Sequence, residues 1–486
     1  MGARTGKEFI EGLRDEREIW LDGERVADVT THPALAGAAH AMAGLFDLQH
    51  EHPDELLVAD EETGDPVNIT HIVPRSLADL QRRRVALERI AHHTLGLMGR
   101  SPDYLNVTMA GFAGRSDIWS LNGNNHGTEN LLRFQREAML KDWSMTHAIV
   151  NPTINKAERE VDNAGGQIVL HVVGETNDAY VIRGARALAT LSPFADEMVV
   201  YPGQPIPRNA TDYALSFSIP MSTPGMKTLC RDSYSTSSDP WNHPFSARFD
   251  EQDAVVIFDD VEVPKDRMFL VGDTEVYNKA MTTGWVANIM QQTTIRAHVK
   301  LTFAWQLATK MAEAVNADAP AVNEMLGELW SYAELTRSVI EAAEAGAHEW
   351  GNGVWFCDER PFRAIRPTLP RWFPRVNEII KLLGSHSLLA TPTRAEMDNP
   401  ELRPLIDLYY QGADMSAEDR VAIFRTAWDF VGSALAGRGE LYERFYLASS
   451  QRMYQVAHAV SVRETDFGVV DSVLHPPQSP SPEVVA

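Results

Sequence analysis

The sequence predicts an α+β protein in which a β-rich segment lies between two helical regions. Apolar residues recur three and four positions apart over much of residues 1–140, as on one face of a helix. Between Asn151 and Val263 the pattern changes to short β-branched runs broken by Gly, Pro and Asp, and from Val276 the helical spacing returns. The predicted division is a helical domain over 1–145, a β-barrel domain over 146–272, a helical bundle over 273–474 and a disordered tail over 475–486.

Two stretches predict the N-terminal helices most clearly. Residues 77–97 (LADLQRRRVALERIAHHTLGL) and 128–141 both space their apolar residues three and four apart, which predicts amphipathic helices. We expect residues 1–140 to be mostly helical.

The middle segment contains five short runs that predict strands. Each is rich in β-branched residues and is bounded by Gly, Pro or Asp, which favours a compact β domain. The runs are GGQIVLHVV (165–173), DAYVIRG (178–184), EMVVYPG (197–203), YALSFSIP (213–220) and AVVIFDDVEVP (254–264).

Three long periodic stretches predict the C-terminal bundle, at 276–315, 323–350 and 416–437. Residues 351–374 are rich in Pro and Arg and predict a loop between helices. The proline-rich tail from His475 predicts disorder.

Composition excludes several classes of partner. The formal net charge of −23 disfavours nucleic-acid binding, because it would repel phosphate backbones. No apolar run approaches the ~20 residues needed to span a bilayer, so we expect no membrane contact. Only two cysteines occur, Cys230 and Cys357, with no cluster of metal-ligand spacing. We therefore expect a cytoplasmic protein without a metal site or a disulfide framework.

The stretch RSPDY (100–104) places a cation and a phenol at a predicted helix start. Ser101 is a good N-cap and Pro102 a good first helical residue, so Arg100 lies just outside the helix and Tyr104 on its first turn. The backbone amides of a helix start also favour anions. The residues alone favour a structural role, in which Arg100 pairs with a carboxylate and Tyr104 fills the core.

Six motifs, in this order along the chain, resemble the oxygenase component of the 4-hydroxyphenylacetate 3-monooxygenase family. The resemblance implies an acyl-CoA dehydrogenase-like fold with FAD between the β domain and the bundle. It also implies hydroxylation of a small phenol next to its hydroxyl group, through a flavin hydroperoxide formed from reduced FAD (FADH2) and O2. The motifs are RSPDY (100–104), THAIVNP (146–152), GARALATLSPFADE (184–197), CRDSY (230–234), FDDVEVP (258–264) and RGELYERFY (438–446).

The family receives its reduced flavin from a separate NAD(P)H-dependent flavin reductase, and the resemblance implies the same partner here. The sequence contains no GxGxxG fingerprint and no Walker loop, so nothing in it predicts an NADH site of its own. The resemblance further implies a homotetramer, although a dimer remains open, as does the use of reduced FMN.

The resemblance implies a catalytic set of Arg100, Tyr104 and His147. A phenol reacts faster as its hydroxyl loses its proton, so the site needs an acceptor for that proton and a cation beside the developing phenolate. Arg100 supplies permanent charge, Tyr104 can donate or accept, and His147 can do either near neutral pH. The same three residues are expected to bind the substrate, together with Gly203 and Gln204 on a covering loop.

The expected flavin contacts come from three parts of the chain. The segment after THAIVNP departs from the family pattern in carrying Lys156, which keeps a positive charge without the planar fork of Arg. The predicted cofactor-binding residues are His147, Ala148, Ile149, Thr153, Asn155, Lys156, Thr190, Ser449, Ser450, Gln451 and Arg452.

Alternative functions remain open. One is an acyl-CoA dehydrogenase-like oxidoreductase, which would need a glutamate base beside the flavin, and another is a non-catalytic flavin-binding protein. An iron–sulfur dehydratase of related fold is excluded, because it needs three cysteine ligands and the chain has two cysteines. The phenol could be a hydroxyphenylacetate, a nitro- or chlorophenol, or a tyrosine-derived precursor.

Overall fold

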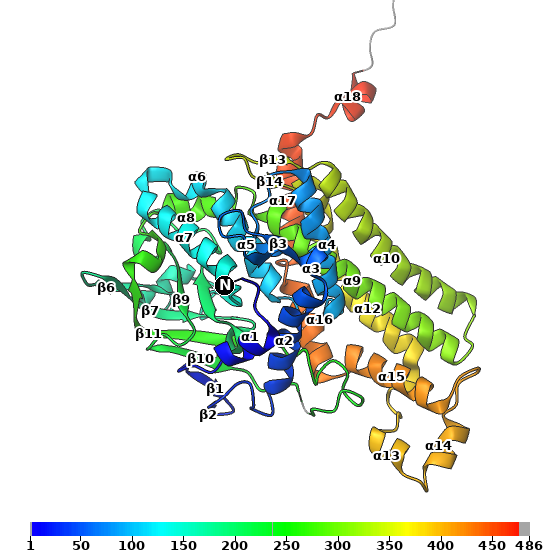
Figure 1. Ribbon diagram of the computed structural model, residues 1–486. Coiled ribbons are helices and arrows are strands. Elements are labelled where there is room, and N and C mark those ends of the chain that lie inside the picture. Colours follow the sequence, from blue (N-terminus) through cyan, green and yellow to red (C-terminus); the bar gives the residue numbers. More distant parts are fainter. Residues whose placement is uncertain (1, 236, 476–486) are drawn as a thin grey trace, which may run out of the picture.

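The computed structural model describes residues 2–235 and 237–475. Most strands gather on one side of the molecule, with α6 and α7 beside them, and the long helices α9 and α10 lie on the other side, with α2–α5 in between (Figure 1). The predicted disordered tail, apart from His475, lies outside the described residues. No helix of the described chain is long and apolar enough to cross a membrane.

The N-terminal region contains the expected helices. The stretch 77–97 forms α4, and 128–141 lies within α7. The helices are α1 (Gly6–Gly12), α2 (Ala36–Glu51), α3 (Pro53–Leu56), α4 (Leu77–His93), α5 (Pro102–Gly114), α6 (Ser116–Trp119) and α7 (Asn125–Lys141).

This region also contains strands that the sequence pattern did not predict. They are β1 (Ile19–Leu21), β2 (Glu24–Arg25), β3 (Leu57–Ala59) and β4 (Pro66–Asn68). β1 pairs in parallel with β10 (Met226–Cys230), with Ile19 opposite Thr228. Strands this short show no alternation, so their pairing with a distant strand decides their structure.

The middle segment forms two sheets. All five predicted strands are present, and β5, β10 and β12 are additional. The strands are β5 (Met145–Ala148), β6 (His171–Glu175), β7 (Ala179–Arg186), β8 (Glu197–Val200), β9 (Leu215–Pro220), β10, β11 (Ala254–Pro264) and β12 (Met268–Val271). The sheet orders are β2-β1-β10-β11-β7-β6 and β12-β9-β8-β5.

These sheets do not close into the barrel that the sequence analysis predicted. Buried side chains from both sheets, among them Ile182, Phe217 and Phe258, form one hydrophobic cluster. No ladder joins the two sheets among the described residues, and the isolated bridge between Val150 and Ala187 is not enough to close them. The two-sheet arrangement buries the same apolar faces that a barrel would, so the strand pattern cannot distinguish them.

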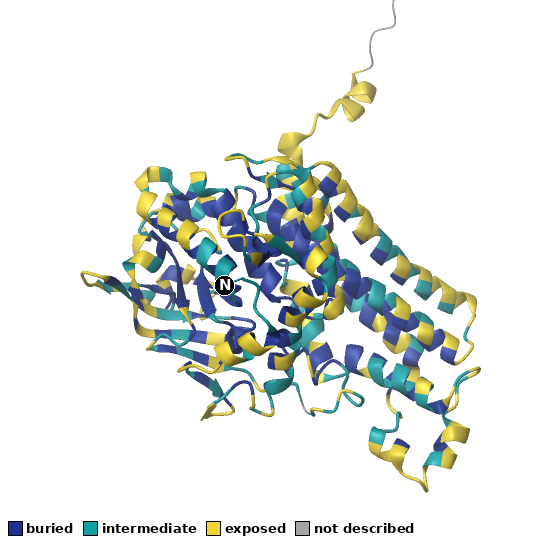
Figure 2. Cartoon of the chain, in the orientation of Figure 1, coloured by how far each residue is buried: buried dark blue, intermediate teal, exposed yellow. Residues whose placement is uncertain are grey.

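The C-terminal region is helical, as predicted. Its elements are α8 (Thr274–Ala280), α9 (Trp285–Ala314), α10 (Pro320–Ala345), β13 (His348–Glu349), β14 (Trp355–Phe356), α11 (Glu359–Ile365), α12 (Leu369–Gly384), α13 (Arg394–Asp398), α14 (Arg403–Tyr409), α15 (Ala417–Val431), α16 (Ala434–Phe445), α17 (Ser450–Glu464) and α18 (Gly468–Leu474). α18 stands away from the body of the molecule and is exposed throughout (Figure 2).

The predicted loop over 351–374 is wrong, because β14, α11 and the start of α12 lie within it. Pro370 occupies the first turn of α12, where a missing N–H group costs nothing. Pro374 lies inside the helix, but Phe373 and Val376 beside it are buried. Burial of this face therefore outweighs the local breaking tendency of proline.

The helix α9 positions α5 against the bundle. Asn288 of α9 donates from Nδ2 to the carbonyl oxygen of Val107 over 2.7 Å. A Cβ atom on Gly111 would lie 2.3 Å from the same Nδ2, so only glycine permits this approach. This close contact holds α5 against α9.

Candidate active site

The first turn of α5 forms as the sequence predicts. Ser101 is the N-cap residue and Pro102 lies at the start of the helix, but the Ser101 side chain makes no capping hydrogen bond. Arg100 precedes the cap and Tyr104 lies one turn in, and only 8% and 4% of their surfaces are exposed. The start of α5 therefore places a guanidinium and a phenol in the interior of the protein.

Arg100 is held by residues from distant parts of the chain. Its Nε donates to Nε2 of His147 over 3.3 Å, and its backbone N–H donates to Oε1 of Glu251 over 2.8 Å. The guanidinium lies 4.0 Å from the ring centroid of Tyr104 and 4.3 Å from that of Tyr446. The structure thus brings together Arg100, Tyr104 and His147, as predicted.

His147 lies on β5 and is neutral. Burial, and then the charge of Arg100, lower the pKa of His147 well below its ordinary value. Because Nε2 accepts a hydrogen bond from Arg100, the proton of the neutral ring belongs on Nδ1. That buried Nδ1 has no partner among the described residues. The ring therefore has one donor available to a ligand.

Two tyrosines of α16 complete the surroundings of Arg100, and the sequence analysis missed both. The rings of Tyr442 and Tyr446 stack with centroids 5.0 Å apart. Arg438 lies 4.2 Å from the Tyr442 ring, and Arg296 lies 4.7 Å from the Tyr446 ring. The spacing of Arg438, Tyr442 and Tyr446 in RGELYERFY, four residues apart, is the signal that could have found them.

A third missed tyrosine, Tyr201, follows β8. It is fully buried, and its ring lies 5.6 Å from that of His147 in an edge-to-face arrangement. Its hydroxyl makes no hydrogen bond of good geometry with a described residue. The apolar run EMVVYPG predicted a strand here but not which way the tyrosine faces.

A buried ionic network holds Arg100 in place. Glu251 accepts from Arg100 and, through Oε2, from Arg438 over 2.7 Å. Arg438 also forms a bidentate pair with Asp253 at 2.7 and 2.8 Å. Although burial opposes its ionisation, Arg438 holds the pKa of Asp253 well below its usual range. The network therefore fixes the backbone of Arg100.

Thr190 joins the same network. Its hydroxyl donates to Oδ1 of Asp253 over 2.8 Å, so only the lone pairs of Thr190 Oγ1 are left for a ligand. The remaining predicted cofactor residues of β5 lie nearby in sequence. Ala148 is buried at the end of the strand, and Ile149 is half-buried.

The other predicted cofactor residues lie on the surface. Thr153, Asn155 and Lys156 are exposed, as are Gln451 and Arg452 of α17. The hydroxyl of Ser449 caps α17 by accepting from the backbone of Arg452 over 3.4 Å, and the hydroxyl of Ser450 donates to the carbonyl oxygen of Pro367 over 2.7 Å. Among the described residues, no hydrogen bond or ion pair joins these groups to the arginine–histidine cluster.

Arg366, which the sequence analysis did not name, lies between α17 and the cluster. Its Nε donates to the carbonyl oxygen of Leu447 over 3.0 Å. Burial lowers the pKa of Arg366, and both Tyr104 and Arg452 act on it electrostatically. This guanidinium is therefore within electrostatic reach of both regions.

The predicted covering loop lies against the segment after β5. A Cβ atom on Gly203 would lie 2.5 Å from the carbonyl oxygen of Ile149, so a larger residue would clash with the backbone. Gln204 is exposed. The loop is tied to α8 by Asn278, which exchanges two 2.9 Å hydrogen bonds with the backbone of Ile206.

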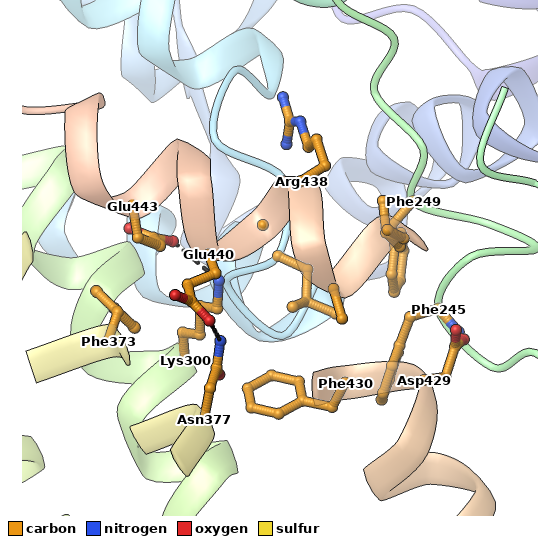
Figure 3. Close-up of a pocket in the computed structure, with 14 residues that line it drawn as sticks. Phe245, Phe249, Lys300, Phe373, Asn377, Asp429, Phe430, Arg438, Glu440 and Glu443 are labelled. Atoms are coloured by element: carbon orange, nitrogen blue, oxygen red, sulfur yellow. Dashed lines mark hydrogen bonds and ion pairs between the residues drawn. The ribbon is translucent and has the colours of Figure 1, made fainter. Parts of the chain in front are cut away.

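A small cavity lies on the far side of Arg438, between α9, α12, α15 and α16 (Figure 3). Phenylalanines line one part of it and the charged Lys300 and Glu443 another. Its volume of about 30 Å³ holds a water molecule but no aromatic ring. The cavity therefore borders the site without offering room for a substrate.

Two models of one protein family match most of the chain. They are 4-hydroxyphenylacetate 3-hydroxylase N terminal, over residues 5–270, and 4-hydroxyphenylacetate 3-hydroxylase C terminal, over residues 277–475. The 4-hydroxyphenylacetate 3-monooxygenase oxygenase component of Thermus thermophilus is 36% identical over 465 residues, which cover 95% of each chain. The 4-nitrophenol 2-monooxygenase oxygenase component of a Rhodococcus species is 33% identical and covers 91% of this chain and 85% of its own.

Solved structures of the same family match the chain as well. The oxygenase component of 4-hydroxyphenylacetate 3-monooxygenase, complexed with FAD and 4-hydroxyphenylacetate, superposes with a TM-score of 0.91 at 35% identity, covering 97% of this chain and 98% of the other. Butyryl-CoA dehydrogenase from Megasphaera elsdenii, at 12% identity and a TM-score of 0.50, covers 94% of this chain and 98% of its own. The second match shows the fold alone, and it confirms the acyl-CoA dehydrogenase-like fold. From the matched motifs, the family models and these relatives together, the chain belongs to the 4-hydroxyphenylacetate 3-hydroxylase family.

Proposed function

We propose that this protein hydroxylates a small phenol next to its hydroxyl group, using O2 and reduced FAD that a separate flavin reductase supplies. The convergence of Arg100, Tyr104 and His147 in the interior carries the proposal. The relatives named as oxygenase components for 4-hydroxyphenylacetate and 4-nitrophenol support it. They also support the reductase, because an oxygenase component implies a second component.

In the proposed reaction, Arg100 and Tyr104 bind the phenolic oxygen. Although burial opposes its charge, Arg100 stays charged at every working pH, because a guanidinium does not lose its proton in proteins. Burial raises the pKa of Tyr104, so it remains a neutral donor. A fixed cation and a fixed donor stabilise a phenolate in a site from which water is excluded.

His147 anchors the phenolic hydroxyl and orders its proton, because its lowered pKa makes the ring an acceptor of a hydrogen bond rather than a strong base. Its neutral ring accepts at Nε2, the atom that now accepts from Nε of Arg100. An entering phenol must displace this hydrogen bond to donate its own proton there. The same displacement frees the Arg100 guanidinium for the phenolic oxygen, so the hydrogen bond to His147 and charge stabilisation by Arg100 form together.

The residues present fit a flavin beside this cluster. His147 has an unpartnered Nδ1 donor, and Thr190 has free lone pairs at Oγ1. Lys156 and Arg452 are exposed cations suited to the phosphates. When bound, reduced FAD would supply the activated oxygen that the phenolate ring accepts. Ala148, Ile149, Thr153, Asn155, Ser449, Ser450 and Gln451 complete the proposed binding set, and Gly203 and Gln204 cover the substrate.

The proposal is tested by turnover with reduced FAD. Purified protein, a flavin reductase, NADH and FAD are supplied with a panel of phenols, and product mass is measured. We expect one oxygen atom added next to the hydroxyl of at least one phenol, and no NADH oxidation by the protein alone. Stoichiometric NADH oxidation without the reductase, or peroxide as the only product with every phenol, would contradict the proposal.

We also propose the three-part organisation at 1–145, 146–272 and 273–474, and assembly into a homotetramer in the cytoplasm. The switches from helices to sheets and back support the boundaries, although β1 reaches into the middle sheet. Free Cys230 and Cys357 suit a reducing compartment. Sedimentation equilibrium tests the assembly, and a monomer at micromolar concentration would contradict it.

A further inference from the structure

Tyr201 carries an inference that goes beyond the proposed set of site residues. Its side chain is fully buried where β8 ends. The ring is held at its sides by two edge-to-face contacts, with His147 at 5.6 Å and with Phe112 at 5.4 Å. Two such contacts in a close-packed interior leave the ring one orientation.

The hydroxyl of Tyr201 is buried and makes no hydrogen bond of good geometry with a described residue. The hydroxyl of Tyr104 lies close enough to interact with it, but a buried hydroxyl without a well-formed hydrogen bond costs about 1–3 kcal/mol. Burial, and then Tyr104, raise the pKa of Tyr201 well above its ordinary value, and Arg100 acts on it in the opposite sense. The hydroxyl is therefore protonated and lies within reach of the groups that face the proposed phenolic oxygen.

We propose that Tyr201 is a further substrate-binding residue, whose hydroxyl donates a hydrogen bond to the phenolic oxygen of the substrate. This inference rests on the proposed function. A phenolate oxygen accepts up to about three hydrogen bonds. Arg100 and Tyr104 account for two of them, and Tyr201 supplies the third from the side of β8. The substrate then satisfies a donor that the protein leaves without a well-formed hydrogen bond.

The proposal separates Tyr201 from a structural tyrosine. A tyrosine whose hydroxyl served the fold would have a protein partner, and its loss would lower stability. For Tyr201 we expect the reverse, because replacement by Phe removes an unsatisfied buried hydroxyl and keeps the ring contacts. Tyr277 of α8, which is also buried but lies outside the site, provides a matched control.

The experiment compares wild type, Tyr201→Phe and Tyr277→Phe as full-length, FAD-saturated proteins. The probe is 4-nitrophenol, whose visible absorbance reports how much of the bound phenol is ionised, measured as a difference spectrum against the same protein without phenol. We expect Tyr201→Phe to bind the nitrophenolate form about tenfold more weakly, with a smaller ionised fraction at each pH. Tyr277→Phe should match wild type.

Turnover and stability supply the second readout. With the reductase present, Tyr201→Phe should lower kcat/KM for the phenol that is hydroxylated best by about tenfold and release more peroxide, while its thermal midpoint equals or exceeds that of wild type. If Tyr201→Phe ionises 4-nitrophenol and turns over like wild type, or if it loses stability, the inference is wrong and the proposed function stands. If wild type itself binds and hydroxylates no phenol, the proposed function fails and Tyr201 loses its role with it.

Discussion

The proposed phenol end and the proposed cofactor end of the site differ in how they are built. Arg100, Tyr104 and His147 are at most 8% exposed and hold one another through a hydrogen bond and ring contacts. Lys156 and Arg452, at the cofactor end, are exposed, and no hydrogen bond or ion pair between described residues joins them to that cluster. One end is thus fixed by packing in the interior, whereas the other presents its charges to solvent.

These two designs let the chain position a phenol strictly and still exchange its flavin. Pre-organised charge in a dry interior is worth far more than charge on the surface. Exposed cations attract a phosphate-bearing molecule and let it leave, because water screens them. A flavin that passes between two proteins needs the second property, and a phenol that must ionise needs the first.

Replacing Arg100 should have the largest effect on this comparison. Arg100→Ala removes the permanent cation, so kcat/KM for hydroxylation should fall by the equivalent of ~2–4 kcal/mol. Product and peroxide per flavin oxidised, in single turnover, measure it, and peroxide should rise as product falls. Arg100→Lys is the matched control, which keeps the charge but not the planar fork. Unchanged product yield in a folded Arg100→Ala variant would show that the buried end is structural.

A change at Asp103 tests how much the burial of a carboxyl group beside the phenol end lowers the stability of the folded protein. Burial raises the pKa of Asp103 to about 6, and the hydrogen bond from Gln292 opposes this only in part. The stability contributed by protonated Asp103 is full below the unfolded pKa of 3.8 and is lost as pH rises through about 6.

Asp103→Asn should therefore be more stable than wild type at pH 8, by as much as ~3 kcal/mol, and the advantage should vanish near pH 3.5. Urea unfolding at several pH values measures it. An advantage that does not change with pH would mean that Asp103 does not titrate in the folded protein.

Tyr104→Phe should have a smaller effect than loss of Arg100, about 1–2 kcal/mol in kcat/KM, because it removes one neutral hydrogen bond to the substrate. The ring and its contact with Arg100 remain, so the thermal midpoint should hold. The ratio of the losses in kcat/KM for Tyr104→Phe and Arg100→Ala compares the contribution of a neutral hydrogen-bond donor with that of a charge. An effect of Tyr104→Phe as large as that of Arg100→Ala would show that Tyr104 does more than donate one hydrogen bond.

The exposed end should give the smallest effect. Lys156→Ala should weaken FAD binding only about two- to fivefold at low salt, and the difference should disappear at high salt, because exposed charges are screened. Fluorescence titration of FAD measures it, with Lys141→Ala, a surface lysine of α7, as control. A salt-independent loss greater than tenfold would place Lys156 in a buried site when flavin is bound.

Much of the fold could be predicted from local pattern. The five longer strands and the helices α4, α7 and α9 appeared where periodicity placed them, because each buries one regular face. The short strand β1 and the helical turns around Pro370 and Pro374 could not be predicted. Their conformations follow from partners elsewhere in the chain, Thr228 for β1 and a buried helix face for α12.

The sequence by itself determined where α5 begins, since Pro102 suits the first position of a helix through its fixed backbone, although the side chain of Ser101 makes no capping hydrogen bond. It also determined the family, because six motifs in order are specific. Only the tertiary structure decided which atoms surround Arg100. Glu251, Tyr446 and Tyr201 lie on separate elements, and their approach follows from sheet pairing and helix packing. Desolvation in that shared interior, which no single segment produces, keeps His147 neutral and Tyr201 a donor.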